Sequence, residues 1–219
     1  MIQCYYTKIS PAIVADKFEW LMSFLPKEKQ KQITLFQNDI DKKLSLYSDI
    51  LVRLITIKTL NICNKKIVFG KNQYGKPFLL GTHDFSFNLS HTREAVIVAI
   101  SDKPIGADIE KTRDAPLDIA NRFFTINEQK YIKQASTNVD KRFYEIWTRK
   151  EAYIKYIGKG LAIPLPSFDV LEPDISPHIE TITTDNYLIS VCSEYVNYRL
   201  PLVELSESMM ESLAEKLLS

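Results

Sequence analysis

Two short stretches of this 219-residue chain combine residue types that bind metal ions and phosphates. Asp108 and Glu110 lie two residues apart in one stretch, and Glu151 and Lys155 lie four residues apart in the other. Carboxylate oxygens are the ligands that Mg²⁺ prefers, and an ammonium can stabilise negative charge on a phosphate. If the fold brings the two stretches together, they could hold a metal ion that binds a diphosphate.

Each pair also has a simpler interpretation. A D-x-E pattern on a strand is most often a solvated acidic face, and Glu151 with Lys155 could form a surface ion pair worth only about 0.3–0.5 kcal/mol. Ser90 and His91 could contact a phosphate, but a hydrogen-bonded structural histidine is an equally good interpretation. The chain has no recognisable nucleophile motif, so the residues give no support to covalent catalysis.

Glu151 and Lys155 belong to a predicted amphipathic helix that ends at Gly158, because the apolar residues recur at helical spacing. Lys150 falls in the middle of the apolar stripe, where an ammonium is costly unless a carboxylate meets it. The sequence therefore predicts an acidic partner for Lys150 from elsewhere in the fold. The stripe consists of Phe143, Ile146, Trp147, Ile154 and Ile157.

Asp108 and Glu110 belong to a predicted strand over residues 105–110. Successive side chains of a strand point to opposite faces, so the apolar residues would share one face and the two carboxylates the other. Both acids would therefore be available to a single cation.

The remaining elements are predicted from periodicity and from the positions of glycine and proline. Strands are expected at residues 2–9, at a possible sheet edge, and at 66–69, 85–89, 95–100, 168–171 and 187–191. Ser90 and His91 are expected in the loop after residue 89. Helices are expected at 12–25, from 39 or 41 to about 60, around 119–124 and 127–134, and at 207–218, with a turn at 74–77. This mixture predicts an α+β fold with a boundary near residues 101–104.

Composition limits the partners. The chain has 28 basic and 27 acidic residues, a net charge of +1, which argues against broad electrostatic binding to nucleic acid or to a membrane surface. No apolar run is long enough to span a bilayer. Three cysteines without a C-x-x-C pair suit a reducing compartment, and we expect a cytoplasmic protein.

The two acidic stretches resemble the signature motifs of the phosphopantetheinyl transferases. They are Gly-Ala-Asp-Ile-Glu at 106–110 and Trp-Thr-Arg-Lys-Glu-Ala-x-x-Lys-x-x-Gly-x-Gly-Leu at 147–161. Three further blocks match in the same order: Tyr-Gly-Lys-Pro at 74–77, Phe-Asn-Leu-Ser-His at 87–91 and Arg-Phe-Phe at 122–124. The resemblance extends from about residue 27 to 165 and is greatest to the monomeric Sfp-type class, which activates peptide and polyketide synthetases.

The resemblance implies an α+β protein of two similar pseudosymmetric lobes, each a small, mostly antiparallel sheet packed with helices. We expect residues 1–104 to form one lobe and residues 105–219 the other. Such an enzyme binds coenzyme A and Mg²⁺, for which Mn²⁺ could substitute, between its lobes. It moves the 4'-phosphopantetheine arm to a serine of an acyl or peptidyl carrier protein and releases adenosine 3',5'-bisphosphate.

The same resemblance implies roles for individual residues. Asp108, Glu110 and Glu151 would hold the metal, Lys155 and His91 would contact the phosphates beside Ser90, and Gly75, Lys76 and Pro77 would border the adenine. Either Glu151 or Glu128 could be the general base. Lys31 and Lys43 are the candidates for the 3'-phosphate, although Leu44 stands where close relatives carry an arginine.

Two other functions remain compatible with these residues. One is a binding module for coenzyme A or carrier proteins that has lost turnover, and the other is a metal-dependent phosphodiesterase. Transfer to a carrier protein, binding without transfer, and release of free phosphopantetheine distinguish the three.

Overall fold

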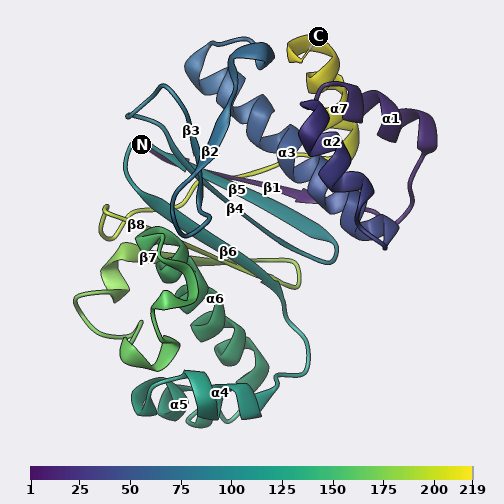
Figure 1. Ribbon diagram of the computed structural model, residues 1–219. Helices are drawn as coiled ribbons and strands as arrows, with labels where there is room; N and C mark the ends of the chain where they lie inside the picture. Colours follow the sequence, from purple (N-terminus) through teal and green to yellow (C-terminus); the bar gives the residue numbers. More distant parts are fainter. Residues whose placement is uncertain (219) are drawn as a thin grey trace.

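The chain folds into two lobes that repeat the same order of elements (Figure 1). The computed structural model describes residues 1–218. Each lobe begins with a strand, continues through a long helix and ends in an antiparallel hairpin, and the first strand pairs with the second strand of the hairpin. This shared topology confirms the expected two-lobed α+β architecture.

The first lobe contains a four-stranded sheet in the order β4-β5-β1-β9, in which only the β1–β9 pairing is parallel. Its strands are β1 (Ile2–Lys8), β4 (Ser86–Thr92), β5 (Ala95–Ser101) and β9 (Leu202–Glu204). Its helices are α1 (Ala15–Ser23), α2 (Lys27–Thr34), α3 (Asp39–Leu60) and α7 (Glu207–Leu217). A separate hairpin pairs β2 (Phe69–Lys71) with β3 (Pro77–Leu79), after a 3₁₀ turn at Asn64–Lys66.

The second lobe contains a three-stranded antiparallel sheet in the order β6-β8-β7. Its strands are β6 (Ile105–Lys111), β7 (Ile179–Thr184) and β8 (Tyr187–Ser193). Its helices are α4 (Leu117–Phe123), α5 (Ile126–Lys133) and α6 (Val139–Ile157). Short 3₁₀ turns lie at Gly160–Ala162, Leu165–Ser167 and Ser176–His178.

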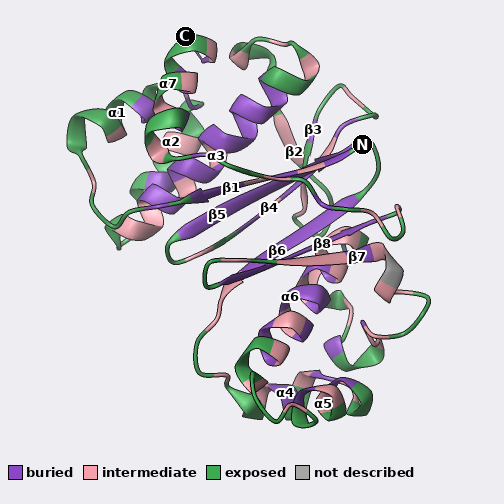
Figure 2. Cartoon of the chain, turned by 180° about the vertical axis from the view of Figure 1, so that it is seen from behind, coloured by how far each residue is buried: buried purple, intermediate pink, exposed green. Residues whose placement is uncertain are grey.

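The two sheets pack face to face in the middle of the molecule, with helices on the outer sides (Figure 2). β5 explains this arrangement, because its residues are apolar on both faces. Val96 and Val98 pack into the core beneath α3, whereas Ile97 and Ala99 pack into the core shared with β6 and β8. A strand buried on both faces reads as a continuous apolar run rather than an alternating one.

Several predicted elements form as expected. The strand at 105–110 forms with its apolar residues in the core between the sheets, and the long helices run through 39–60 and 139–157. Gly158 ends α6 with a φ of 73°, in the left-handed region that glycine enters without strain.

Other expectations are wrong. β1 is not an edge strand, because β5 and β9 flank it, and Ser90 and His91 lie within β4 rather than in a loop. Residues 168–171 form no strand, whereas 179–184 do, and the strand expected at 66–69 forms at 69–71.

The expected range of 105–219 assigned the C-terminal segment to the second lobe, but this segment packs with the first lobe. β9 pairs with β1, and α7 packs against α3. Met210, Ala214 and Leu218 lie in the core of the first lobe. Among residues 1–218, no helix is long and apolar enough to cross a membrane.

Candidate functional site

Strand β6 and helix α6 lie in direct backbone contact, and Gly106 makes this possible. A Cβ atom at Gly106 would lie 2.1 Å from the Ala152 carbonyl oxygen and 2.2 Å from the Tyr156 nitrogen. Contacts that short do not occur, so any larger residue would push the helix away from the strand. The carboxylates that follow Gly106 on β6 are thereby brought next to Glu151 and Lys155 on α6.

These side chains line one hollow of about 440 Å³ between β4, β6 and α6. The charged and polar residues around it are Ser90, His91, Asp108, Glu110, Glu151 and Lys155. The structure thus brings together the three acids expected to bind the metal and the residues expected to contact the phosphates. Trp147 of α6 forms an apolar wall.

Asp108 is the best-defined acid in this hollow. Its Oδ1 accepts hydrogen bonds from Lys155 Nζ at 2.6 Å and from Ser90 Oγ at 2.8 Å. Its Oδ2 is buried and has no hydrogen-bond partner among residues 1–218. A buried carboxylate oxygen without a partner is costly, so the side chain is suited to an additional positive ligand.

The other two acids also have environments that favour a cation. Burial and the neighbouring Asp108 raise the pKa of Glu110 to about 7. The same two causes raise the pKa of Glu151. Three carboxylates that face one hollow repel one another, and a divalent cation would relieve this repulsion.

An oxygen-only donor set of this kind fits Mg²⁺, which is held by a few carboxylates together with water and phosphate oxygens. Among residues 1–218, however, no group of three His, Cys, Asp or Glu side chains is arranged to hold a metal ion as it stands. In this arrangement, the ammonium of Lys155 neutralises Asp108 instead.

A second hollow of about 400 Å³ adjoins the first and shares Leu89 and Lys155 with it. The turn at 74–77 lines one side, and Ile154, Lys155 and Gly158 of α6 line the other. The two hollows therefore form one groove, acidic at one end and bordered by the predicted adenine-binding turn at the other.

Lys76 is one of the residues that line this second hollow. Its Nζ donates to the carbonyl oxygens of Ile105 at 2.9 Å and Tyr156 at 3.2 Å. Burial lowers the pKa of Lys76 to about 8. The ammonium therefore joins protein elements, while Gly75 and Pro77 complete the turn beside it.

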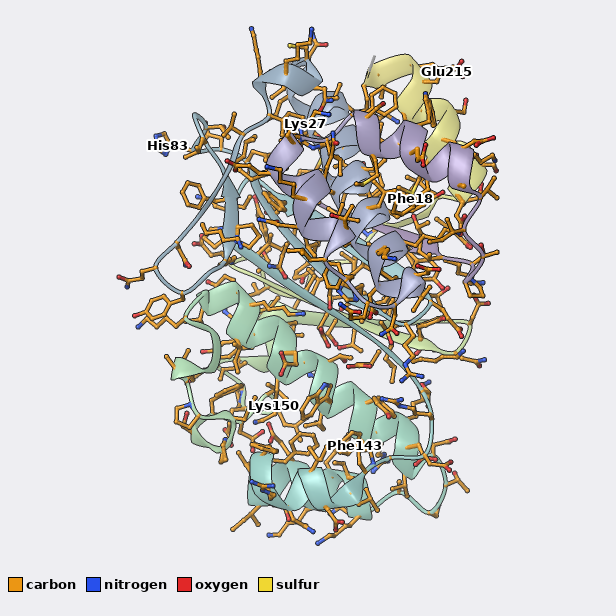
Figure 3. The ribbon with its side chains drawn as sticks, turned by 45° about the vertical axis from the view of Figure 1, so that its right-hand side comes forward. Phe18, Lys27, His83, Phe143, Lys150 and Glu215 are labelled. Atoms are coloured by element: carbon orange, nitrogen blue, oxygen red, sulfur yellow. The ribbon has the colours of Figure 1, made fainter. Side chains whose placement is uncertain are left out.

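Glu128 has a different environment from the one expected for a general base. It is fully buried, and its Oε1 accepts from Lys150 Nζ at 2.7 Å and from the Val170 nitrogen at 2.9 Å. Its Oε2 accepts from the Thr125 nitrogen in a capping box at the start of α5. Glu128 is thus the predicted acidic partner of Lys150, which projects from α6 (Figure 3), and both of its oxygens are occupied.

The residues expected to bind the 3'-phosphate are not gathered together. Lys31 is exposed on α2. Lys43 is 4% exposed, and its Nζ donates to Ser10 Oγ at 2.9 Å, the Ala12 carbonyl at 2.7 Å and Glu207 Oε2 at 2.8 Å. With the Ser10 carbonyl at 3.0 Å, four acceptors share the three ammonium protons, so the expected phosphate role of Lys43 is at odds with its position. Leu44 is buried in the first-lobe core.

Two residues without a predicted role of their own help to build the site. Gly106 permits the contact between β6 and α6, and a glycine inside a strand is a signal for such close approach. Asn88, on β4, accepts a hydrogen bond from the Ala107 nitrogen at 2.8 Å and joins the edges of the two sheets. A polar residue beside an apolar strand run was the available signal, but its partner lies in the other lobe.

Comparisons with known proteins agree with this geometry. Residues 104–203 match the model of the 4'-phosphopantetheinyl transferase superfamily, and residues 12–103 match that of the 4'-phosphopantetheinyl transferase N-terminal domain.

Individual relatives extend the match over most of the chain. The chain is 41% identical to 4'-phosphopantetheinyl transferase gsp of Aneurinibacillus migulanus, over 77% of this chain and 70% of the relative. It is 35% identical to 4'-phosphopantetheinyl transferase Sfp of Bacillus subtilis (strain 168), over 84% of this chain and 88% of the relative. A Xenopus laevis L-aminoadipate-semialdehyde dehydrogenase-phosphopantetheinyl transferase is 33% identical, over 73% of this chain and 57% of the relative. The chain therefore belongs to the 4'-phosphopantetheinyl transferase superfamily, as an enzyme of the Sfp type.

Proposed function

We propose that this enzyme transfers the 4'-phosphopantetheine arm of coenzyme A to a serine hydroxyl of a carrier protein, with Mg²⁺, and releases adenosine 3',5'-bisphosphate. The observation that carries the proposal is the convergence of three acids and Lys155 on one hollow, where Asp108 Oδ2 is left without a partner.

In this proposal, Asp108, Glu110 and Glu151 hold the metal, which when bound would neutralise the diphosphate and hold its oxygens in line. Lys155 lies where the two hollows meet, so its ammonium can move from Asp108 to a phosphate oxygen. His91 and Ser90 border the same hollow; His91 can donate a further hydrogen bond, while Ser90 holds Asp108 and Lys155 in place.

Glu151 is the proposed general base. Its side chain faces the hollow in which the serine hydroxyl would approach the diphosphate, so it can accept the serine proton there. Glu128 is buried in its pair with Lys150, so it cannot receive the serine proton directly. The turn at 74–77 would border the adenine at the other end of the groove.

We also propose that the partners are acyl or peptidyl carrier domains of peptide or polyketide synthetases. A monomer suffices, because both lobes and all three acids come from one chain. Cys4, Cys63 and Cys192 are free thiols, which suits a cytoplasmic enzyme.

The direct test is mass spectrometry of carrier domains incubated with coenzyme A and this enzyme, with and without Mg²⁺. The expected result is a metal-dependent mass increase of one phosphopantetheine at the acceptor serine, with equimolar adenosine 3',5'-bisphosphate. Binding of coenzyme A without modification of any carrier would favour a binding module, and release of free phosphopantetheine would favour a phosphodiesterase.

A further inference from the structure

The turn between β2 and β3 is fastened to the second lobe by the side chains of Asn72 and Lys76, which we call the latch. Asn72 Nδ2 donates to the carbonyl oxygen of Gly158 at 2.9 Å. Lys76 Nζ donates to Tyr156 and Ile105, at the end of α6 and the start of β6. The latch therefore forms hydrogen bonds to both β6 and α6, the elements that carry the proposed metal ligands.

The orientation of the Asn72 amide follows from its neighbours. Its Oδ1 accepts from the backbone nitrogens of Tyr74 at 2.9 Å and Lys76 at 3.0 Å. Two N–H donors require an oxygen, so the amide nitrogen must face Gly158. One side chain thus orders the turn with its oxygen and holds the other lobe with its nitrogen.

The end of α6 is a favourable place for such contacts. The last carbonyls of a helix have no partner within the helix and carry the negative end of its dipole. The amide of Asn72 and the ammonium of Lys76 supply donors to two of them. Gly158 lies so close that a Cβ there would be 3.0 Å from Lys76 Cδ.

The latched turn is also one wall of the second hollow, and α6 supplies the opposite wall. Lys155 of α6 reaches both hollows, so the separation of turn and helix sets how the nucleotide and diphosphate ends of the groove align. We propose that Asn72 is a positioning residue, which holds the nucleotide side of the groove against the α6 residues that face the diphosphate. This inference rests on the proposed function.

The test compares Asn72→Asp with Asn72→Ala. Aspartate keeps the two accepted hydrogen bonds, loses the donor to Gly158 and places a negative charge at the helix C-terminus. We expect the KM and the calorimetric Kd for coenzyme A to rise about threefold to tenfold, the worth of one hydrogen bond, with kcat within about twofold. Alanine should raise both constants at least as much, because it also loosens the turn.

Asn64→Asp is a matched control. Asn64 donates to the Phe24 carbonyl at 2.9 Å and accepts from Arg53 Nη1 at 2.9 Å, entirely within the first lobe. This variant should lower the Tm without changing the KM for coenzyme A. Hydrogen exchange should increase in Asn72→Asp at both the turn and the end of α6.

Wild-type constants for coenzyme A in Asn72→Asp, or a lower kcat at unchanged KM and Kd, would overturn the inference. If the wild-type enzyme modifies no carrier, the proposed function fails. The calorimetric Kd and the exchange at the two fastened segments would then still decide whether Asn72 positions the groove.

Discussion

The hydrogen bonds of Asp108 indicate that the site can bind a positively charged ligand. One of its carboxylate oxygens is held by Ser90 and Lys155, and the other is buried without a partner among residues 1–218. Asparagine has the same shape and keeps an acceptor for the first two contacts, but it removes the charge. The Asp108→Asn substitution therefore tests the role of the charge in metal binding while it keeps the shape of the side chain.

Asp108→Asn should lower kcat about a thousandfold or more, since a metal-bound phosphoryl group gains several kcal/mol of charge stabilisation. The Tm without metal should change little, because the loss of the ion pair with Lys155 offsets the relief of repulsion among the three acids. Transfer assays and thermal unfolding measure the two effects. Asp102→Asn changes an exposed acid paired with the N-terminus and should leave transfer intact; near-normal activity of Asp108→Asn would contradict the metal assignment.

The raised pKa of Glu110 predicts how the affinity for a metal ion depends on pH. Because its pKa is raised to about 7, the carboxyl is protonated below neutral pH and must lose a proton to bind a cation. The affinity for Mn²⁺, followed by electron paramagnetic resonance, should therefore increase as the pH rises from about 5 to 8 and then level off. A pH-independent affinity would contradict this assignment.

The same group affects stability in the opposite sense. The folded state binds this proton more tightly than the unfolded state, in which the pKa is near 4.5. Without divalent metal ions, the free energy of unfolding should therefore fall as the pH rises from 4.5 to about 7. Glu110→Gln should remove this decline, which urea unfolding at several pH values would reveal.

Glu128 and Lys150 form a buried pair whose role is structural. Lys150→Met leaves the Glu128 carboxylate buried without its ammonium and should destabilise the enzyme by about 3–5 kcal/mol. The double variant Lys150→Met with Glu128→Gln should recover much of this loss, as measured by urea unfolding. A fall in kcat for folded Glu128→Gln, with Tm unchanged, would instead restore a catalytic role for Glu128.

At the element scale, the sequence predicted the parts of the site that depend on local periodicity. Alternation placed Asp108 and Glu110 on one face of a strand, and helical spacing identified α6 and its end at Gly158. The pattern also required an acid for Lys150. It could not name Glu128, because that residue comes from a helix whose docking is set by tertiary packing.

The errors at this scale have a common physical cause. Ser90 and His91 are polar, which predicts a loop, but the antiparallel pairing of β4 with β5 continues through both. Both residues border a hollow that β6 and α6 of the other lobe help to form. The end of β4 is therefore polar, and its sequence resembles that of a loop. The 179–184 strand has mixed polarity because it lies at the edge of its sheet and only Ile179 in it is buried.

The contact of β6 with α6 can be tested through Gly106. Gly106→Ala would force the helix backbone away from the strand and should destabilise the enzyme by about 3 kcal/mol or more. Transfer should also fall, because the acids of β6 and α6 separate. Urea unfolding and kcat measure both effects.

Gly81→Ala is the control for this prediction. Gly81 has a φ of 83°, and a Cβ there would meet nothing within 4 Å. It should therefore cost only about 1–2 kcal/mol of backbone strain and leave kcat unchanged. Equal losses of stability in the two variants would show that helix contact does not explain the requirement for Gly106.

At the scale of the whole molecule, the two lobes share a core between their sheets and a groove at their junction. The sequence predicted the α+β class, whereas the return of the C-terminal segment to the first lobe gave no local signal. The helix at 207–217 is amphipathic in either lobe, and only its packing against α3, together with the pairing of β9 with β1, decides between them.

Removal of residues 202–219 tests this assignment. The truncated chain would lose β9 beside β1 and the buried side chains Met210 and Ala214 of α7. We expect a large fall in Tm or aggregation, with unfolding of α3 and β1 detected first by hydrogen exchange. If the second lobe lost protection while the first kept it, the placement of this segment would be contradicted.

The parallel pairing of β9 with β1 has a consequence for biosynthesis. On the ribosome, the first strand emerges almost two hundred residues before the neighbour that completes its sheet. The first lobe therefore keeps one open strand edge until β9 has emerged, whereas the strands and helices of the second lobe can assemble as they appear. Slow synthesis of the segment between β5 and β9 would prolong the period in which that open edge can pair with another nascent chain.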